Sequence, residues 1–480
     1  MAAAQAVAVE PGTNVLVSQP TGTAPAAIPA TNSSLISSFG GIGPSSSESA
    51  RVVSSAQNNR FVAFVSDADG LSPDDDDSVR NVYVRDTLTN TVELISRASG
   101  FAGAGANGDS FEPAIDASGR YVAFTSDADN LVEGSGGIDH VYLRDRVTGT
   151  TRIVDRADGP NGAIANDSSG DPSVTTIGSD PVVAFTSWAD NLDGASNVSQ
   201  VFVRYFGSHD TERVSLADNS TTVAANASAS KPSISADASS IAFETQANNL
   251  IPGPDNNGAH DVYIRRLATN DTVIVSLEGM TLGDGPSYAA SVNGDGSAVA
   301  FVSEATNWAG ADDTSDDQDI YVRTFTPNDD LRLVSRASGV AGVKGNGDSL
   351  HPVIDESGQT IVFSSRASNL AAGDTNGVED VFIRTGALGG TPNTALVSRP
   401  DNNSIADGPS TSPSIAGQPF LLGNYRVAYA TGADNMGPDD EDDFAQIYAR
   451  TVGTVVGANP ASYVSRPGTE PFRSGVNNSI

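Results

Sequence analysis

A repeat of about 60 residues runs through most of this sequence and limits what it can fold into. Each copy contains an alternating apolar run that ends in arginine, such as NVYVR, HVYLR or DVYIR, and successive arginines lie 58 to 66 residues apart. The seven are Arg85, Arg144, Arg204, Arg265, Arg323, Arg384 and Arg450. Repeated units bury their apolar faces against one another, so seven copies predict one continuous architecture instead of the roughly three domains that length alone suggests.

Each unit contains four short runs with two-residue alternation, separated by Gly, Asp, Asn and Pro. In the second unit these runs are 113–116, 121–126, 141–144 and 151–155, and no window shows a helical apolar period. Radial packing of four-stranded antiparallel units buries both sheet faces. The sequence therefore predicts an all-β fold, a seven-bladed β-propeller; the alternative, an all-β solenoid, usually has shorter repeats.

The consensus sequence of the repeat unit resembles that of a known family. It reads S-x-x-P-x-I-D-x-S-G-R-Y-V-A-F-T-S-D-A-D-N-L, then D-x-V-Y-x-R-D, then a strand containing V-S-R. This wording resembles the TolB-type, WD-like propeller repeat, from residue 46 to about residue 470. The resemblance implies the fold, but that repeat serves many roles, so it implies no particular activity.

The repeat also predicts how the chain is divided. Residues 1–45 are rich in small and polar residues and are expected to be a linker with one strand-like run at 14–18. Residues 46–471 are expected to form the propeller and 472–480 a C-terminal tail. The expected blades are 46–100, 101–159, 160–219, 220–279, 280–339, 340–400 and 401–471.

Two segments compete for one structural role. NVLVSQP near the N-terminus and ASYVSRP near the C-terminus both look like the fourth strand of a blade, and seven blades need only one of them. The N-terminal copy could complete the last blade as a clasp, or it could add at an edge while the C-terminal strand 462–465 stays with its blade. The long connection from Ser18 to Ala50 favours the clasp.

Composition excludes several function classes. A net charge of -33 disfavours nucleic acid and anionic membranes as partners, and the absence of cysteine excludes disulfides and thiolate chemistry. No apolar run approaches the roughly 20 residues of a membrane span. The N-terminus lacks an intact signal peptide, but Ala4-Gln5-Ala6 has the form of a cleavage site, and we expect a secreted, periplasmic or cell-surface location.

The connections between the second and third strands of each unit are acidic. In an antiparallel blade these connections and those between blades emerge on one face, so the acidic loops ring one mouth. Closely spaced oxygen ligands suit calcium, although each loop can also be a solvated turn in which Asp and Asn bond their own backbone. The predicted calcium ligands are Asp374, Asn376, Glu379, Asp380, Asp74, Asp76, Asp312, Asp316, Asp439 and Asp442.

Two further repeated residues have structural explanations. The Ser-x-Ala-x-Asn-Leu turns place an asparagine at one equivalent position in six units, such as Asn130 and Asn369, and a left-handed backbone is the expected reason. One arginine per unit, such as Arg144, follows the symmetry of the fold and predicts an ion pair or a backbone tie.

Common catalytic motifs are absent from the sequence. There is no G-x-S-x-G, H-E-x-x-H or P-loop, and the four histidines lie in separate units. We therefore expect a non-catalytic binding or scaffold propeller whose protein or carbohydrate ligand, with calcium assisting, binds at the acidic face and central channel. The alternatives are a carbohydrate-active lyase or hydrolase using carboxylates at the mouth, and a structural extracellular repeat protein that is part of a longer chain.

Overall fold

The structure is a computed structural model in which every named element is a β-strand. It describes residues 6–8, 14–17, 51–52, 60–68, 71–72, 74, 79–194, 197–253, 255, 257–308, 317–325, 329–400, 402–416, 424–436 and 445–455. Within these ranges no helix is long and apolar enough to span a membrane.

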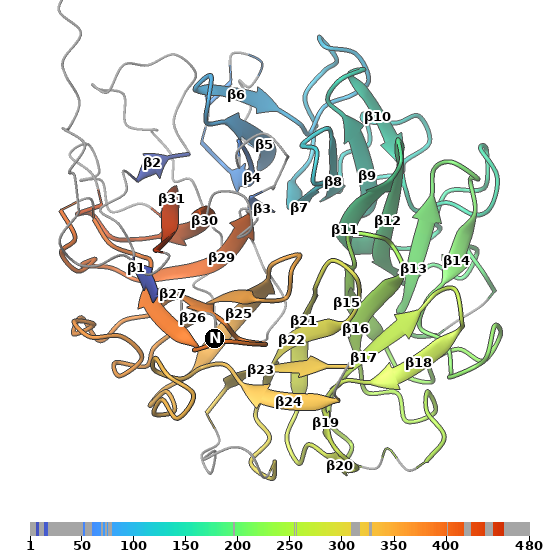
Figure 1. Ribbon diagram of the computed structural model, residues 1–480. Helices are drawn as coiled ribbons and strands as arrows, with labels where there is room; N and C mark the ends of the chain where they lie inside the picture. Colours follow the sequence, from blue (N-terminus) through green and yellow to red (C-terminus); the bar gives the residue numbers. More distant parts are fainter. Residues whose placement is uncertain are drawn as a thin grey trace, which may run out of the picture.

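Seven antiparallel sheets are arranged radially, and their colours follow one another around the circle in Figure 1. The chain is a seven-bladed β-propeller, as the repeat predicts. Blade 1 contains β3 (Arg51–Val52), β4 (Phe61–Ser66), β5 (Asn81–Asp86) and β6 (Thr91–Leu94); blade 2 contains β7 (Ser110–Ile115), β8 (Tyr121–Ser126), β9 (His140–Asp145) and β10 (Thr150–Ile153); blade 3 contains β11 (Ser169–Ile177), β12 (Asp180–Ser187), β13 (Gln200–Tyr205) and β14 (Thr211–Arg213); blade 4 contains β15 (Ala229–Ile234), β16 (Ser240–Thr245), β17 (Asp261–Arg266) and β18 (Asp271–Ile274). Blade 5 contains β21 (Ser287–Val292), β22 (Ala298–Ser303), β23 (Asp319–Thr324) and β24 (Asp330–Leu333); blade 6 contains β25 (Ser349–Ile354), β26 (Thr360–Ser365), β27 (Asp380–Thr385) and β28 (Asn393–Leu396); blade 7 contains β29 (Ser410–Ala416), β30 (Asn424–Thr431) and β31 (Gln446–Val455) with the N-terminal β1 (Ala6–Ala8) and β2 (Val15–Leu16).

The N-terminal strand β2 occupies the fourth position of blade 7. It pairs antiparallel with β31 through Val15 opposite Ala449 and Leu16 opposite Tyr448. Just beyond it, the Val17 amide donates to the Ile447 carbonyl at 2.7 Å. Figure 1 shows β1 and β2 beside β31, so the two ends of the described chain meet without a covalent link. The competing segment 462–465 lies outside the described residues.

The apolar core lies between blades. Seven clusters of buried side chains each join two neighbouring blades, and the cluster that closes the circle contains Val17 together with Phe64 of blade 1 and Ala449 of blade 7. Within six blades, an aromatic ring of the second strand stacks on one of the third at centroid distances of 5.5 to 6.1 Å, as Phe124 does on Tyr142. These repeated contacts explain why the V-A-F and V-Y motifs recur along the sequence.

In six blades the repeated arginine bonds to the preceding blade or to the connection that leads from it. Arg144 of β9 is buried, and its guanidinium donates to the carbonyls of Ala98 and Gly100 at 3.1 and 3.0 Å and to the Thr151 hydroxyl at 3.0 Å. Both carbonyls belong to the connection from blade 1 to blade 2, and Arg204, Arg265 and Arg384 make equivalent bonds. The predicted backbone tie is confirmed.

The prediction for the repeated asparagines is wrong in its mechanism. None of the six has a positive φ. Instead, the Asn130 side chain donates to the Gly105 carbonyl at 2.8 Å and accepts from the Asn107 amide at 3.1 Å. The other five make the same donor bond to a connection 25 to 30 residues earlier. These side chains hold together two connections on one face of the propeller. Local sequence does not predict the bond, because its two partners are far apart in the chain.

Candidate functional site: a charged ring at the channel mouth

The innermost strand of six blades carries a β-bulge at one repeat position. The register of β7 shifts between Phe111 and Ala114, and β11, β15, β21, β25 and β29 shift at the equivalent place. The residue at each bulge has a φ between 51° and 53°, a region that non-glycine residues seldom adopt. The six residues, here named the bulge ring, are Glu112, Asp171, Lys231, Ala289, His351 and Ser412.

The bulge ring is where the blades differ from one another. Its side chains include two acids, a lysine and a histidine, whereas the position two residues earlier is serine in five of the six blades and alanine in the other. The innermost strands surround the channel, and the bulges lie near their first residues. The ring therefore lies at the mouth on the side of the acidic loops, where a bulge can re-aim side chains.

Glu112 and Asp171 form the acidic side of the ring. Glu112 Oε2 accepts from the Asp171 backbone amide and from the Thr125 hydroxyl, both at 2.8 Å. Burial, followed by the nearby Asp171 carboxylate, raises the pKa of Glu112 to about 7. Near neutral pH this carboxyl can therefore donate or accept a proton.

Lys231 lies on the next blade and is compensated by a glutamate. Its ammonium nitrogen is 3.5 Å from Glu244 Oε1, and Glu244 Oε2 accepts from the Ala289 amide at 2.9 Å. Ala289 itself contributes only a methyl group. The ring therefore has a gap at blade 5, between Lys231 and His351.

Two hydroxyl groups and a more distant carboxylate surround the His351 ring. Its Nδ1 is 3.0 Å from the Ser364 hydroxyl and 3.3 Å from the Thr411 hydroxyl, and it lies 4.0 Å from Glu379 Oε1. Burial lowers the pKa of His351, Lys231 lowers it further, and Glu379 opposes both. Nevertheless 32% of the His351 side chain stays accessible, because it faces the channel mouth.

A second set of residues surrounds the bulge ring. In each blade this set consists of the residue that follows the second strand and the residue that precedes the third. In blades 1, 5 and 6 the two side chains form an ion pair or a hydrogen bond with each other. Blade 2 instead places Asp127 beside Asp139, and burial together with Asp127 raises the pKa of Asp139. Blade 3 has Trp188 at the same position, with 49% of its surface exposed. The blade 2 and blade 3 side of the mouth thus combines carboxylates with an accessible aromatic ring.

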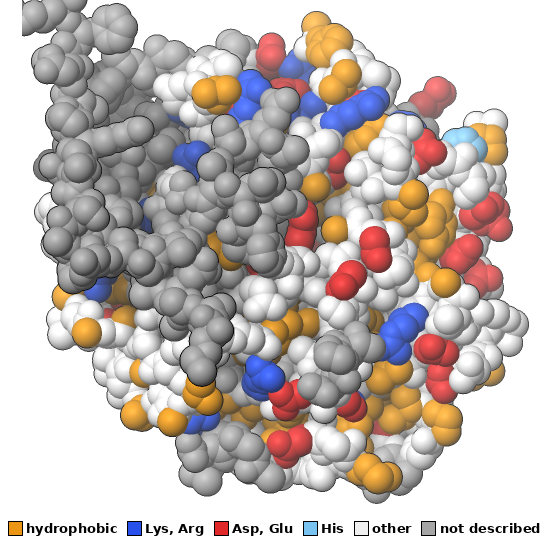
Figure 2. Space-filling view, viewed as in Figure 1, with side chains coloured by type: hydrophobic (Ala, Val, Ile, Leu, Met, Phe, Trp, Pro, Cys, Tyr) orange, Lys and Arg blue, Asp and Glu red, His pale blue; other side chains and the backbone are white. Residues whose placement is uncertain are grey.

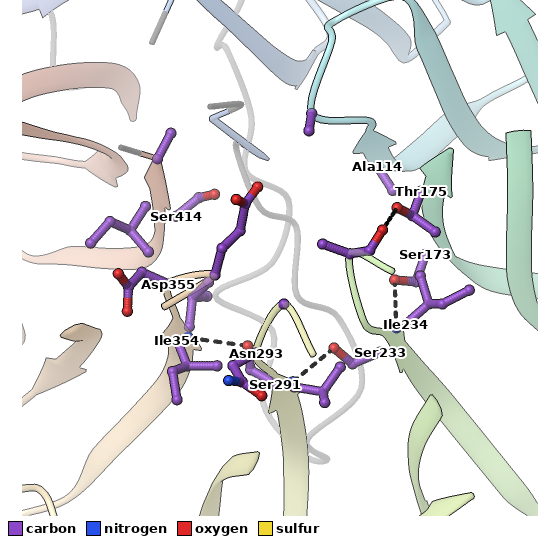
Figure 3. A pocket seen from close by; sticks show the side chains of 18 of the residues that line it. Ala114, Ser173, Thr175, Ser233, Ile234, Ser291, Asn293, Ile354, Asp355 and Ser414 are labelled. Atoms are coloured by element: carbon purple, nitrogen blue, oxygen red, sulfur yellow. Dashed lines mark hydrogen bonds between the residues drawn. The ribbon is translucent and has the colours of Figure 1, made fainter. Parts of the chain in front are cut away.

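A cavity of about 160 Å³ lies at the opposite end of the channel. Figure 3 shows serines from successive blades around it. The hydroxyl oxygens of Ser173, Ser233 and Ser291 each accept a hydrogen bond from a backbone amide of the next blade, at 3.1 to 3.2 Å. These bonds satisfy amides on the inner edge of the sheets, so the serine ring is primarily structural.

The predicted calcium ligands around residue 376 separate into different roles. Asn376 Nδ2 donates to Asp380 Oδ2 at 2.8 Å, and Asp380 Oδ1 accepts from the Ser398 hydroxyl at 2.6 Å. Burial raises the pKa of Asp374, with Arg399 opposing, whereas Glu379 Oε1 accepts from the Thr411 hydroxyl at 3.1 Å beside the bulge ring. The structure brings Asn376 and Asp380 together and directs Glu379 elsewhere.

The remaining predicted ligands give less information. Asp74 Oδ2 pairs with Arg97 at 2.7 Å. Asp76, Asp312, Asp316, Asp439 and Asp442 lie outside the described residues. In the part of the chain that is described, no three His, Asp or Glu side chains are grouped as metal ligands, and calcium at the other loops stays a prediction.

The bulge ring was not predicted. Its signal in the sequence is the residue before proline in S-x-x-P, which reads E-P, D-P, K-P, H-P and S-P in otherwise similar units. The acidic side chains visible in Figure 2 are spread over several blades, so charge alone does not locate the ring.

No protein-family model and no curated protein matches this chain. Solved structures are similar to it. The β-propeller domain of the Trilobed protease from Pyrococcus furiosus is 11% identical with a TM-score of 0.45, covering 84% of this chain and 93% of that one. The putative TolB from Agrobacterium tumefaciens is 12% identical with a TM-score of 0.38, covering 75% and 94%.

A puromycin-hydrolyzing peptidase from Mycobacterium tuberculosis is 10% identical with a TM-score of 0.46. The match covers 90% of this chain but 55% of the peptidase, so the chain corresponds to about half of that protein. By its own strand order and register, the chain is a seven-bladed β-propeller, similar in architecture to these structures.

Proposed function

We propose that this chain is a non-catalytic binding module whose ligand, a protein or carbohydrate, docks over the bulge ring. One observation carries the proposal. A single backbone position, strained in the same way in six blades, holds Glu, Asp, Lys and His around one axis. Strained backbone and broken repeat symmetry are typical of functional positions, whereas a purely structural position would repeat its residue as the arginines do.

The charge distribution favours a ligand with a cationic or hydrogen-bonding group. No ion pair of the described residues involves Glu112, Asp171, Asp127 or Asp139, whereas Lys231 has Glu244 beside it. The mouth thus has net negative potential on blades 2 and 3, strengthened by the overall charge of -33. Trp188, exposed on the same side, adds a surface for stacking a sugar ring or a cation.

A binding screen tests the proposal directly. Neutral, amino and uronic oligosaccharides and a tetralysine peptide are titrated into the protein by calorimetry, followed by the double variant Glu112→Gln with Asp171→Asn. We expect at least a tenfold loss of affinity in the variant for any probe that binds. Glu133→Gln is the matched control, because it removes one charge from an exposed loop of blade 2. Equal affinities in both variants would place the ligand elsewhere.

One observation favours a second candidate, a carbohydrate-active enzyme. Glu112, with its pKa of about 7, accepts from the Asp171 amide and lies near the Asp171 side chain, and a carboxyl group that can donate a proton near a second carboxyl group is the pairing used in glycoside cleavage. The same oligosaccharides separate the two functions after prolonged incubation. A binding module returns them intact, while an enzyme yields shorter products at a rate that falls as pH rises through 7.

The exported location and the assistance of calcium are parts of the same proposal. The cleavage-like Ala4-Gln5-Ala6 motivates the first, and the acidic loops at 74–77, 312–317 and 439–443 motivate the second. Fractionation of cells that produce the chain with its native upstream sequence tests the location.

A further inference from the structure

The outer edge of β31 accepts a strand from elsewhere in the chain. Its other edge pairs with β30 from Gln446 to Gly453, and the outer edge holds β2 at Tyr448 and Ala449 and β1 at Gly453 to Val455. The N-terminal segment therefore occupies the outer edge at Ile447 to Ala449 and at Gly453 to Val455, and a second strand cannot pair there while it stays.

The chain encodes a second segment of the same kind. The bound segment reads NVLVSQP at 14–20, the fourth strand of blade 6 and its continuation read TALVSRP at 394–400, and ASYVSRP occupies 461–467. The C-terminal copy shares V-S-R-P with blade 6, so it matches that strand more closely than the N-terminal copy does. It follows β31 in sequence, as the fourth strand follows the third in every other blade.

Alignment of the two copies places Val464 at the position of Val17. Val17 is fully buried in the cluster that joins blade 7 to blade 1. The equivalent residues Ile95, Val154, Val214, Val275, Val334 and Val397 are all buried to within 1%. Valine at 464 therefore fits this site without any change in side chain.

We propose that the outer edge of β31 is an exchangeable site and that its second occupant is segment 461–467 of the same chain. Ser462 would then lie opposite Ala449, where Val15 lies in the structure. That register turns the chain back after β31, which requires Gly453 to Val455 to leave β1. The two closures exclude each other, and exchange releases the N-terminal segment from the propeller.

Buried-charge variants of the full chain test the exchange. Val17→Asp should displace β2 and lower Tm modestly, because segment 461–467 replaces it. Val464→Asp alone should leave Tm within about 1 °C of wild type. The variant with both changes should lose far more than the sum of the two shifts. Additive shifts would overturn the proposal.

Val334→Asp provides a matched control in blade 5, which has no spare strand. We expect it to prevent folding or lower Tm as much as the double variant does. If Val17→Asp alone is as damaging as Val334→Asp, no second segment replaces β2 and the proposal fails.

Disulfide trapping identifies the occupant, because the chain has no cysteine of its own. In the Val17→Asp background, Ala449→Cys with Ser462→Cys should give an oxidised monomer with an internal disulfide, read by mass and by gel mobility. Val15→Cys with Ala449→Cys should trap the closure of the structure in an otherwise wild-type chain. Failure of the first pair to cross-link, or cross-links between two chains, would overturn the assignment to the same chain.

Discussion

His140 Nδ1 lies 2.7 Å from Asp155 Oδ2, and both side chains are almost completely buried. In blades 1 and 3 to 6 the same two positions hold an Asn, Gln or Asp that accepts a hydrogen bond from a serine, at 2.5 to 2.6 Å. Blade 2 thus contains a buried histidine and aspartate where its neighbours contain a polar residue and serine. In each case the serine or aspartate also accepts a hydrogen bond from the backbone amide of the residue that follows the first partner, as Asp155 Oδ1 does from Val141.

Replacing this pair with the version from blade 3 should be tolerated. His140→Leu leaves the buried Asp155 without its partner and should cost about 3 to 5 kcal/mol of unfolding free energy. The double variant His140→Gln with Asp155→Ser copies Gln200 and Ser215 and should lie within about 1 kcal/mol of wild type. Urea unfolding measures both. A double variant as unstable as His140→Leu would show that the pair depends on features of blade 2 that the repeat does not contain.

The equivalent acids Asp380 and Asp261 make stability depend on pH. Burial raises the pKa of each from 3.8 to about 6, so the folded state holds these protons more tightly than the unfolded chain. Below pH 3.8 both groups are protonated in the folded and in the unfolded chain, so they do not change the free energy of unfolding. As pH rises from 3.8 through about 6, ionisation favours the unfolded chain and the protein is progressively destabilised. The shift corresponds to roughly 3 kcal/mol for each group at neutral pH.

Asp380→Asn should therefore stabilise the protein only above the lower pKa. The amide still accepts from Ser398, as Asn81 does from Ser96, but it loses the bond from Asn376, so we expect a net gain of about 1 to 2 kcal/mol at pH 7.5 and none at pH 4. The matched control Asp319→Asn removes an ion pair with Lys344 at 2.9 Å and should lower stability at pH 7.5. A gain at pH 4 equal to that at pH 7.5 would disprove the charge explanation.

The guanidinium of Arg144 should not be replaceable by lysine. One ammonium group cannot reach Ala98, Gly100 and Thr151 together, so Arg144→Lys leaves buried carbonyls without donors and should cost about 2 to 3 kcal/mol. Arg332→Lys, at an arginine whose side chain is 44% exposed and which donates to one backbone carbonyl, that of Ala387, serves as control and should change stability by less than about 0.5 kcal/mol. Guanidinium unfolding distinguishes the two, and equal costs would contradict a role for the blade tie.

Regular blade structure was predictable because it depends on local alternation. The run Tyr121 to Ser126 was predicted with the bounds of β8, since alternating apolar residues are enclosed by a Gly-Arg turn and by Asp127. The innermost strand of the same blade was predicted to begin at Pro113, but β7 begins at Ser110. Proline marks a bulge inside that strand instead of its start, because a bulge tolerates a residue without an amide proton.

The candidate site was missed for a related reason. Its residues lie about 60 positions apart, and nothing local indicates that Glu112 accepts from the Asp171 amide or that Glu244 accepts from that of Ala289. The acidic loops are recognisable from sequence because their charges are consecutive. Chemistry assembled by circular symmetry becomes visible only when the units are aligned and the one variable position is compared.

The calcium hypothesis concerns the loops at 74–77, 312–317 and 439–443. It predicts that millimolar Ca²⁺ raises Tm, because a ligand that binds only the folded state adds about 2.7 kcal/mol at one hundred times its Kd. Mg²⁺ at the same ionic strength is the control, since it holds its water more tightly. Asp312→Asn with Asp316→Asn should abolish the shift if that loop binds the ion. Identical unfolding curves with Ca²⁺, with Mg²⁺ and after chelation would remove the hypothesis.

Strain at the bulge ring can be measured where the side chain is simplest. Ala289 has a φ of 53° and contributes only a methyl group, so its conformation is imposed by the fold. Ala289→Gly removes the clash between Cβ and the backbone, while glycine adds freedom to the unfolded chain. Because strain of this kind costs about 1 to 3 kcal/mol, we expect a net stabilisation of about 0.5 to 1 kcal/mol.

Ala114→Gly is the matched control for Ala289→Gly, because Ala114 lies on an innermost strand without a positive φ. It should destabilise the protein by roughly 0.5 to 1 kcal/mol, as glycine does within an ordinary strand. Opposite signs for the two substitutions would establish that the ring is strained even where it contains no charge. Strain is then a property of the blade, and the acids, lysine and histidine occupy positions that the backbone prepares. A destabilised Ala289→Gly would instead show that the bulge is relaxed, and the case for a functional ring would rest on charge alone.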